Sequence, residues 1–169
     1  MKLLSLLPVF WILTASVWAK DNGVIYSPEL VKNAELGDAI SQCNLGICYA
    51  EGIGVTKDEK QAVKWYRNSA EKGNAYAQVL LGVCLSKGHG TAKNEKESIK
   101  WITKSAKQGD AIGQFNLGTL YLQGIGVPKD KNKCVFWWTK AAEQENLVSG
   151  DHLVASRICK RELETLNSK

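Results

Sequence analysis

The sequence predicts an all-α protein, a solenoid of stacked helix-turn-helix repeats. Two observations predict this fold. Residues 38–73, 74–109 and 110–145 align without a gap at a spacing of 36 residues. Each of these segments also holds two stretches with helical periodicity, joined by a Gly-x-Gly loop. Nine residues of the first segment recur at the same place in both later ones: Ala39, Gln42, Leu45, Gly46, Gly52, Gly54, Lys57, Trp65 and Ala70.

Capping residues set the helix boundaries within each repeat. An aspartate or asparagine at the start of a helix can accept a hydrogen bond from the unpaired N–H groups of the first turn. The first helix ends at the first loop glycine, because glycine readily adopts the left-handed backbone conformation that ends a helix. The second helix runs past the recurring tryptophan to Ala70, Ala106 or Ala142. The predicted N-caps are Asp38, Asn74 and Asp110 for the first helices and Asp58, Asn94 and Asp130 for the second.

Three further segments flank the repeats. Residues 1–19 combine one charge, at Lys2, with an uncharged apolar stretch, which is typical of a secretory signal peptide cleaved near Ala19. Residues 20–37 hold a half-repeat helix that begins at Ser27 and Pro28. Residues 146–169 hold a C-terminal capping helix of the polar kind that a stack of repeats needs. The sequence therefore predicts an exported protein, periplasmic or secreted.

The composition excludes two other kinds of chain. Hydrophobic residues make up 44% of the 169 residues and the net charge is +5, whereas disordered chains are less hydrophobic and more highly charged. Five cysteines are too few for a small domain held together by disulfides. The chain is long enough to bury a core without such bonds.

The repeat resembles a known family. The segment AISQCNLGICYAEGIGVTKDEKQAVKWYRNSAEKG, residues 39–73, is similar to the Sel1-like repeat, a TPR-related helical hairpin. The resemblance implies a right-handed α-solenoid that binds a protein partner, is not an enzyme and needs no cofactor. Exported members of this family include host-contact factors, envelope adaptors and inhibitors of toxic effector enzymes. The last role, that of an immunity protein, is the one that a short exported array of repeats suits.

The first helix of each repeat is apolar on two sides, where a surface helix needs only one. One side is expected to pack on the second helix of the repeat, and in TPR-like stacks the other side lines a concave groove. The pattern therefore predicts a hydrophobic groove for a partner protein; burial by the neighbouring layers explains the same pattern equally well. The predicted groove residues are Ile40, Cys43, Ile47, Tyr76, Val79, Val83, Ile112, Phe115, Thr119 and Leu122.

The second helices carry a basic stripe on their outer side. Acidic residues are interspersed with it, which favours an ordinary solvated face. The alternative function is an envelope adaptor or scaffold that the stripe holds on an anionic surface. Nucleic acid is not an expected partner outside the cytoplasm, and the membrane is expected to contact only the signal peptide. The stripe consists of Lys60, Lys64, Arg67, Lys96, Lys100 and Lys104.

Aromatic residues recur on the same helices. Trp65, Trp101 and Trp137 occupy one position of the repeat, which predicts that they pack in the core. Phe136 takes the place that lysine holds in the basic stripe of the other repeats. It is expected to be covered by the C-terminal helix; the alternative is a second contact patch.

No catalytic or metal site is predicted. Cys43 and Cys48 are the one close cysteine pair, and five residues along a helix point them roughly 140° apart. An enzyme that acts on cell-wall material or β-lactams is a further alternative that the resemblance implies, but the relatives given that role carry a cysteine pair in every repeat. A disulfide between Cys134 and Cys159 is hypothesised, because an antiparallel arrangement of the last two helices brings these residues together.

Overall fold

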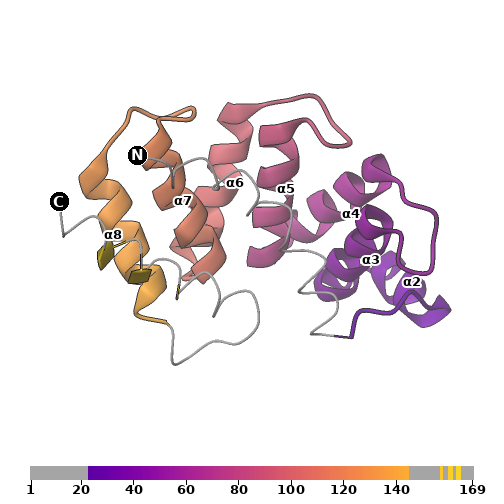
Figure 1. The fold of residues 1–169 in the computed structure, drawn as a ribbon. Helices are drawn as coiled ribbons and strands as arrows, with labels where there is room; N and C mark the ends of the chain where they lie inside the picture. The colour runs from indigo at the N-terminus through magenta and orange to yellow at the C-terminus, as the bar shows by residue number, and fades with distance from the viewer. Residues whose placement is uncertain (1–22, 145–156, 158–159, 162, 165–169) are drawn as a thin grey trace.

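The computed structural model of the chain describes residues 23–144 together with residues 157, 160–161 and 163–164. These residues form helices and no strands (Figure 1). Among them, no helix combines the length and the apolar character that crossing a bilayer requires. The helices between residues 23 and 144 are α2 (Pro28–Glu35), α3 (Ala39–Glu51), α4 (Glu59–Glu71), α5 (Ala75–Lys87), α6 (Glu95–Lys107), α7 (Ala111–Gln123) and α8 (Lys131–Ala142).

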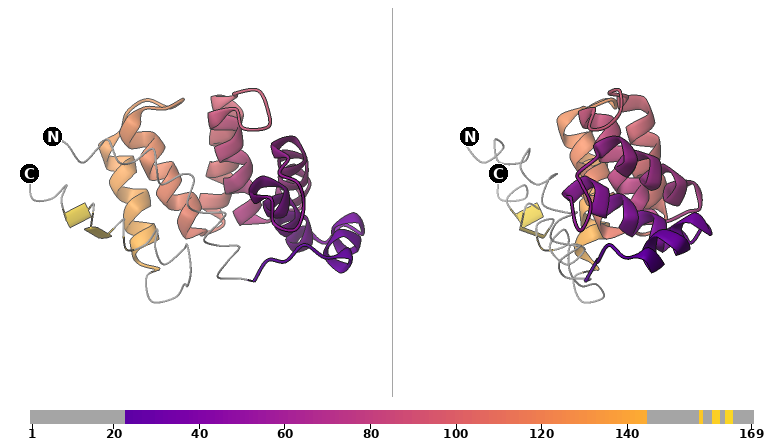
Figure 2. Two further views of the ribbon diagram at one scale, coloured as in Figure 1. Left: turned by 45° about the vertical axis from the view of Figure 1, so that its right-hand side comes forward. Right: turned by 90° about the vertical axis from the view of Figure 1, so that its right-hand side faces the viewer.

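The helices form a row in which each one packs against the next in the sequence. We call α3, α5 and α7 the A helices, and α2, α4, α6 and α8 the B helices. Each A helix packs between the B helix of the preceding repeat and the B helix of its own repeat. Figure 2 shows the same row from two further directions, with α2 at one end and α8 at the other. The predicted all-α repeat fold is confirmed.

The capping residues lie where the sequence predicts them. The Asp38 carboxylate accepts a hydrogen bond from the N–H of Ser41 at 2.7 Å, and the other five predicted N-caps bond to the first turn of their helices in the same way. Gly52 ends α3 with a φ of 74°. The backbone N–H of Asp58 donates to the carbonyl oxygen of Tyr49 at 2.8 Å, so the start of α4 is bonded directly to the end of α3. The equivalent bond is present in both later repeats.

The recurring glutamine joins successive repeats. The Gln42 amide donates to the carbonyl oxygen of Ala34, at the end of the preceding B helix, over 3.0 Å. Gln78 and Gln114 make the same bond to the preceding B helices at 3.1 and 3.4 Å. The glutamine is buried in all three repeats, where its amide adds a second hydrogen bond to a carbonyl that already accepts one from the backbone N–H of the glycine closing the B helix.

The helices of one repeat meet at the recurring glycine of the A helix. A Cβ atom at Gly46 would lie 2.6 Å from the ring of Tyr66, and Gly82 stands equally close to Ile102. Tyr66 and Ile102 are fully buried, as is Trp138, which occupies the same place against Gly118. Glycine is therefore required at this position because a large side chain of the B helix fills the space beside it.

The prediction that the recurring tryptophans form the core is wrong. Trp65, Trp101 and Trp137 are only half-buried. The fully buried position is the next residue along each B helix, because that residue points at the glycine of the A helix. The tryptophans lie at the edge of the core, beside lysines of the outer face: the ammonium group of Lys104 lies 4.5 Å from the centre of the Trp101 ring.

Several predictions fall on the two ends of the chain. The signal peptide of residues 1–19 and Cys159 lie outside the described residues. Of the predicted capping helix, residues 157, 160–161 and 163–164 are helical, and Leu163 packs against the main core cluster. Ser27 caps α2 as predicted, because its hydroxyl accepts a hydrogen bond from the N–H of Leu30 at 3.1 Å.

Candidate protein-binding surface

The structure buries most of the predicted groove. Among the ten residues, only Ile40 is exposed, and Val83 and Leu122 are half-buried. A partner protein cannot reach buried side chains without unpacking the helices, so the prediction of an open groove along all three repeats is wrong. The predicted groove residues that the structure shows to be buried are Cys43, Ile47, Tyr76, Val79, Ile112, Phe115 and Thr119.

The second apolar side of the A helices is used for packing between helices. The ring of Phe115 on α7 stacks on the ring of Trp138 on α8, with 6.0 Å between the centroids. The hydroxyl of Thr119 donates to the carbonyl oxygen of Phe115 at 2.9 Å. Every residue from 111 to 120 is buried, so α7 is covered on all sides. Burial by neighbouring layers, the alternative explanation of the pattern, is correct for this helix.

The apolar stripe opens at the first repeat. Ile40, Tyr76 and Ile112 occupy one position of the repeat, and their exposed fractions are 63%, 7% and 2%. Leu36, which caps the end of α2 four residues before Ile40, is 76% exposed. We call Leu36 and Ile40 the N-terminal apolar edge; α2 and α3, which carry it, lie at one end of the row in Figure 1.

Sequence reasoning missed Leu36, and a signal for it is present in the sequence. The counterparts of Leu36 in the next two repeats are Lys72 and Gln108. A leucine where the other repeats carry polar residues indicates a side chain that the repeat fold does not need in its core. Phe136 gives the same signal, because its counterparts are Lys64 and Lys100.

Phe136 is 51% exposed. The prediction that the C-terminal helix covers it is therefore wrong. The Phe136 ring meets the Trp137 ring edge to face, with 5.1 Å between centroids, and the ammonium group of Lys140 lies 5.2 Å from its centre. This exposure is consistent with the alternative, in which Phe136 belongs to a second contact patch on the outer side.

The basic stripe is partly neutralised by an ion pair between repeats. The guanidinium of Arg67 on α4 lies 2.6 Å from the carboxylate of Glu97 on α6. Trp101 donates its ring N–H to the same carboxylate at 3.2 Å. The hydrogen bond from Arg67 holds the pKa of Glu97 below its ordinary value of 4.5. The stripe is therefore a mixed surface in its middle, as the solvated-face interpretation expects.

The ion pair gives a pH-dependent contribution to stability. Because the pKa of Glu97 is lower in the folded chain, the contribution is present above pH 4.5 and is lost as the pH falls through the folded pKa. Glu97→Gln is expected to lower the free energy of unfolding by up to about 1 kcal/mol at pH 7, since the pair is partly exposed. Denaturant unfolding of both proteins should show this difference shrinking below pH 4.5.

A more exposed pair serves as the control. Glu59 lies 3.7 Å from Lys57, and both side chains are largely in solvent. Glu59 and Glu97 both stand in the first turn of a B helix, so Glu59→Gln removes the same favourable interaction with the helix dipole. Its effect on the free energy of unfolding is expected to be smaller than that of Glu97→Gln, because the Lys57–Glu59 pair is more exposed. A difference between wild type and Glu97→Gln that stays constant from pH 7 to pH 3 would contradict the assigned role of the Arg67–Glu97 pair.

The comparisons with known proteins identify the repeat. The Sel1 repeat family matches residues 39–74, 75–110 and 111–146. The chain belongs to the Sel1 repeat family. Its repeats begin one residue after the predicted starts, which changes neither the number of repeats nor their period. Proteins of this family generally mediate protein–protein interactions and are typically scaffolds rather than enzymes.

Two solved structures show the same fold. One is the crystal structure of c5321, a protective antigen present in uropathogenic Escherichia coli strains that displays an SLR fold; it is 35% identical, with a TM-score of 0.65, over 69% of this chain and 25% of that one. The other is a Sel1 repeat protein from Oxalobacter formigenes, 38% identical, with a TM-score of 0.62, over 64% of this chain and 44% of that one. This chain thus matches less than half the length of either. A search of curated proteins found no match.

The four cysteines that the structure describes in this Sel1 repeat chain are free thiols, three of them buried and Cys84 half-buried. Cys134 is free and buried, and its hypothesised disulfide partner, Cys159, lies outside the described residues, so that disulfide stays a prediction. Cys134 lies in the same core cluster as Trp138. Burial raises the pKa of Cys134 and of Cys84 to about 12. These thiols are protonated at neutral pH and are poor nucleophiles.

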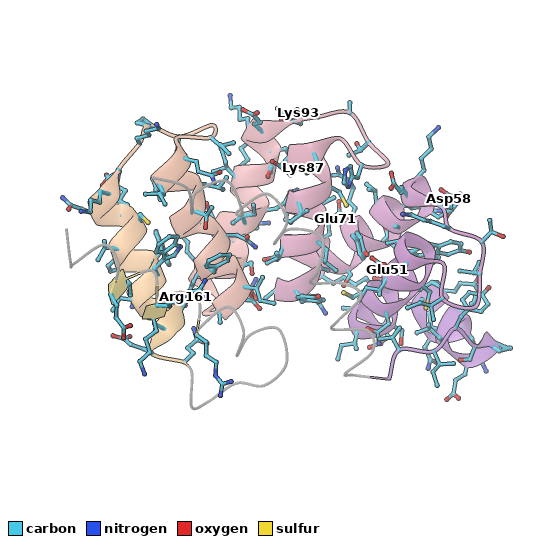
Figure 3. All side chains as sticks on the ribbon, viewed as in Figure 1. Glu51, Asp58, Glu71, Lys87, Lys93 and Arg161 are labelled. Carbon is cyan, nitrogen blue, oxygen red and sulfur yellow. The ribbon has the colours of Figure 1, made fainter. Side chains whose placement is uncertain are left out.

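Two features of the described Sel1 repeats bear on a possible metal or ligand site. Within residues 23–144 and the described part of the last helix, no group of three histidine, cysteine or acidic side chains could hold a metal ion. An open depression of about 660 Å³ lies between the α5–α6 loop and the start of α4. Figure 3 labels Asp58 just before α4, Lys87 at the end of α5, and Lys93 within that loop. The depression holds two acidic and two basic side chains, and Asp58 is already used as a helix cap.

Proposed function

We propose that this chain is an exported, non-enzymatic module that binds a partner protein through its N-terminal apolar edge. One observation carries the proposal: the apolar stripe of the A helices is packed within the fold at Tyr76 and Ile112 but is open to solvent at Ile40. The family supports protein binding in general, and the apolar segment at residues 1–19 supports export.

The N-terminal apolar edge has the character of a contact surface. Ile40 and Leu36 flank the turn at Gly37 and Asp38, and both side chains are more than half exposed. Exposing two large aliphatic side chains this close together gives the folded chain no stability, whereas burying them against a partner would. A partner that packs on Ile40 and Leu36 would bury the apolar stripe at α3 as the chain's own helices bury it at α5 and α7.

We further propose that the partner is a toxic effector enzyme, which the chain blocks as an immunity protein. Blocking an enzyme needs only a binding surface that covers its active site or holds it in an inactive state. The inhibitors among exported members of this family, together with the predicted signal peptide, support this role. The alternative role, an envelope adaptor, uses the same surface without loss of the partner's activity.

Ile40→Asp is expected to weaken the complex by about 2 kcal/mol or more, or roughly thirtyfold in Kd, because a carboxylate would be buried at an apolar contact. The fold should be retained, since an acidic residue in the first turn of α3 interacts favourably with the helix dipole. The partner is first captured from envelope extracts and identified by mass spectrometry. Its Kd for wild type and variant is then measured with purified proteins by calorimetry.

Thr56→Asp is the matched control, because it places the same charge on an exposed loop away from the edge. It should bind the partner as wild type does. Equal affinity of Ile40→Asp and wild type would show that the partner binds elsewhere. An assay of the partner's own activity separates the two roles: loss of activity on adding the chain supports the inhibitor, and unchanged activity supports the adaptor.

A further inference from the structure

The outer face of α8 carries an exposed aromatic group among lysines. Lys133, Phe136, Trp137 and Lys140 are spaced i, i+3, i+4 and i+7, so they share one side of the helix. The opposite side holds the buried residues Cys134, Trp138 and Ala141. We call the four outer residues the aromatic–lysine face.

This face is distinct in charge from the other B helices. Residues 131–142 include three lysines and no acidic side chain. The nearest acidic residues in the sequence are the two caps of the helix, Asp130 and Glu143, and the Asp130 carboxylate lies 3.2 Å from the ammonium group of Lys133. By contrast, α4 and α6 each carry two acidic residues among their lysines. The preceding B helix, α6, carries Lys100 and Lys104, both exposed.

We propose that the aromatic–lysine face docks on an anionic lipid surface, with the Phe136 ring in the boundary between headgroups and acyl chains. Phenylalanine and tryptophan beside lysine are the residues that interfacial helices use, because the ring leaves water while the ammonium groups stay among anionic headgroups. Lys140 suits this arrangement, since its ammonium group lies 5.2 Å from the centre of the Phe136 ring. This inference goes beyond the proposed function and does not use the N-terminal apolar edge.

A lipid surface fits the chemistry of the face better than a protein does. Protein interfaces are enriched in arginine and depleted in lysine, and α8 carries lysine alone as its basic residue. The face also includes exposed residues on the outer side of α8, so a soft, flat surface can receive it without a matching groove. Each lysine close to an anionic membrane adds attraction that salt weakens.

The test measures partition onto vesicles by sedimentation. The protein used begins at Lys20 and keeps every core residue that the structure describes, the first of which is Val24; its melting curve is recorded beside that of the full chain. Binding is expected to vesicles that contain phosphatidylglycerol, to fall as salt is added, and to be weak on phosphatidylcholine alone. Phe136→Gln should lower the partition coefficient about tenfold by removing the ring, and Lys140→Gln about fivefold by removing one charge.

Ile25→Gln is the matched control, because Ile25 is an exposed apolar residue at the other end of the chain. It should partition as wild type does. Wild type that fails to bind anionic vesicles, or Phe136→Gln that binds them as well as wild type, would overturn the proposal. Two further results would overturn it: a dimer in sedimentation equilibrium that Phe136→Gln abolishes, or a weaker affinity of that variant for the captured protein partner. Either result would show that the aromatic–lysine face binds a protein.

Discussion

Replacing Trp138 by alanine is expected to lower the free energy of unfolding by about 3–5 kcal/mol. The side chain is 1% exposed and fills the space beside Gly118 on α7. Its ring stacks on Phe115, and its ring N–H donates to the carbonyl oxygen of Phe115 at 3.1 Å. Alanine would leave a cavity between α7 and α8 and remove that hydrogen bond. Urea unfolding followed by circular dichroism measures the change.

The adjacent tryptophan is the matched control. Trp137 is half-buried and packs at the edge of a smaller cluster around Ile102 and Leu117. Trp137→Ala should therefore cost clearly less, about 2 kcal/mol or below, because part of the ring already contacts water. If Trp137→Ala were the more damaging substitution, the recurring tryptophan would be the core residue after all, and the packing of α7 on α8 described here would be wrong.

The architecture could be predicted because its signals are local in the sequence. A period of 36 residues, a capping side chain before each helix and a glycine after each A helix are all visible in one chain. The Asp38 cap and the left-handed Gly52 depend only on residues a few positions away. Such features do not require knowledge of how one repeat lies on the next.

The register of the B helices was harder to predict. Trp65 and Tyr66 are adjacent large aromatic residues, and periodicity alone does not say which of them faces the A helix. The glycine at position 46 decides it, because only the Tyr66 ring reaches that space. In the third repeat the two candidates are Trp137 and Trp138. The sequence prediction chose Trp137 because tryptophan recurs at that position in all three repeats, but the buried residue is Trp138.

The predicted groove failed for a related reason. An A helix in a stack has neighbours on both sides, so two apolar sides are needed for packing alone. A sequence cannot distinguish that requirement from an apolar surface kept for a partner. The difference shows only where one repeat breaks the pattern of burial, as Ile40 does beside the buried Tyr76 and Ile112. Departures from the repeat, rather than the repeat itself, are therefore the better guide to binding surfaces in this chain.

The second glycine of each loop has a role that its recurrence alone does not reveal. It allows the loop to pack closely against the segment that precedes the repeat. A Cβ atom at Gly54 would lie 2.7 Å from the Cβ atom of Tyr26, and one at Gly126 would meet the side chain of Ile99. At Gly90 the neighbour is backbone, the carbonyl group of Glu59 at the start of α4. Backbone cannot move aside as the end of a flexible side chain can.

Gly90→Ala is therefore expected to lower the free energy of unfolding by about 3 kcal/mol. Its φ of 65° is a conformation that alanine adopts only at a cost of about 1–2 kcal/mol. The added methyl group would also overlap the Glu59 carbonyl and lie 2.9 Å from the N–H nitrogen of Lys60, and overpacking of this kind costs about 1–3 kcal/mol more. Thermal and urea unfolding of the variant measure the sum of the two effects.

Gly88→Ala separates the two contributions. Gly88 also has a left-handed backbone, with a φ of 78°, but the nearest atom to an added Cβ is 3.5 Å away. This variant should show the conformational cost alone, about 1–2 kcal/mol. The difference between the two variants then measures how tightly the loop of the second repeat is held against α4. Equal losses in both would mean that the loop moves away from α4 freely, and that the second glycine is kept for its backbone conformation and not for the contact between repeats.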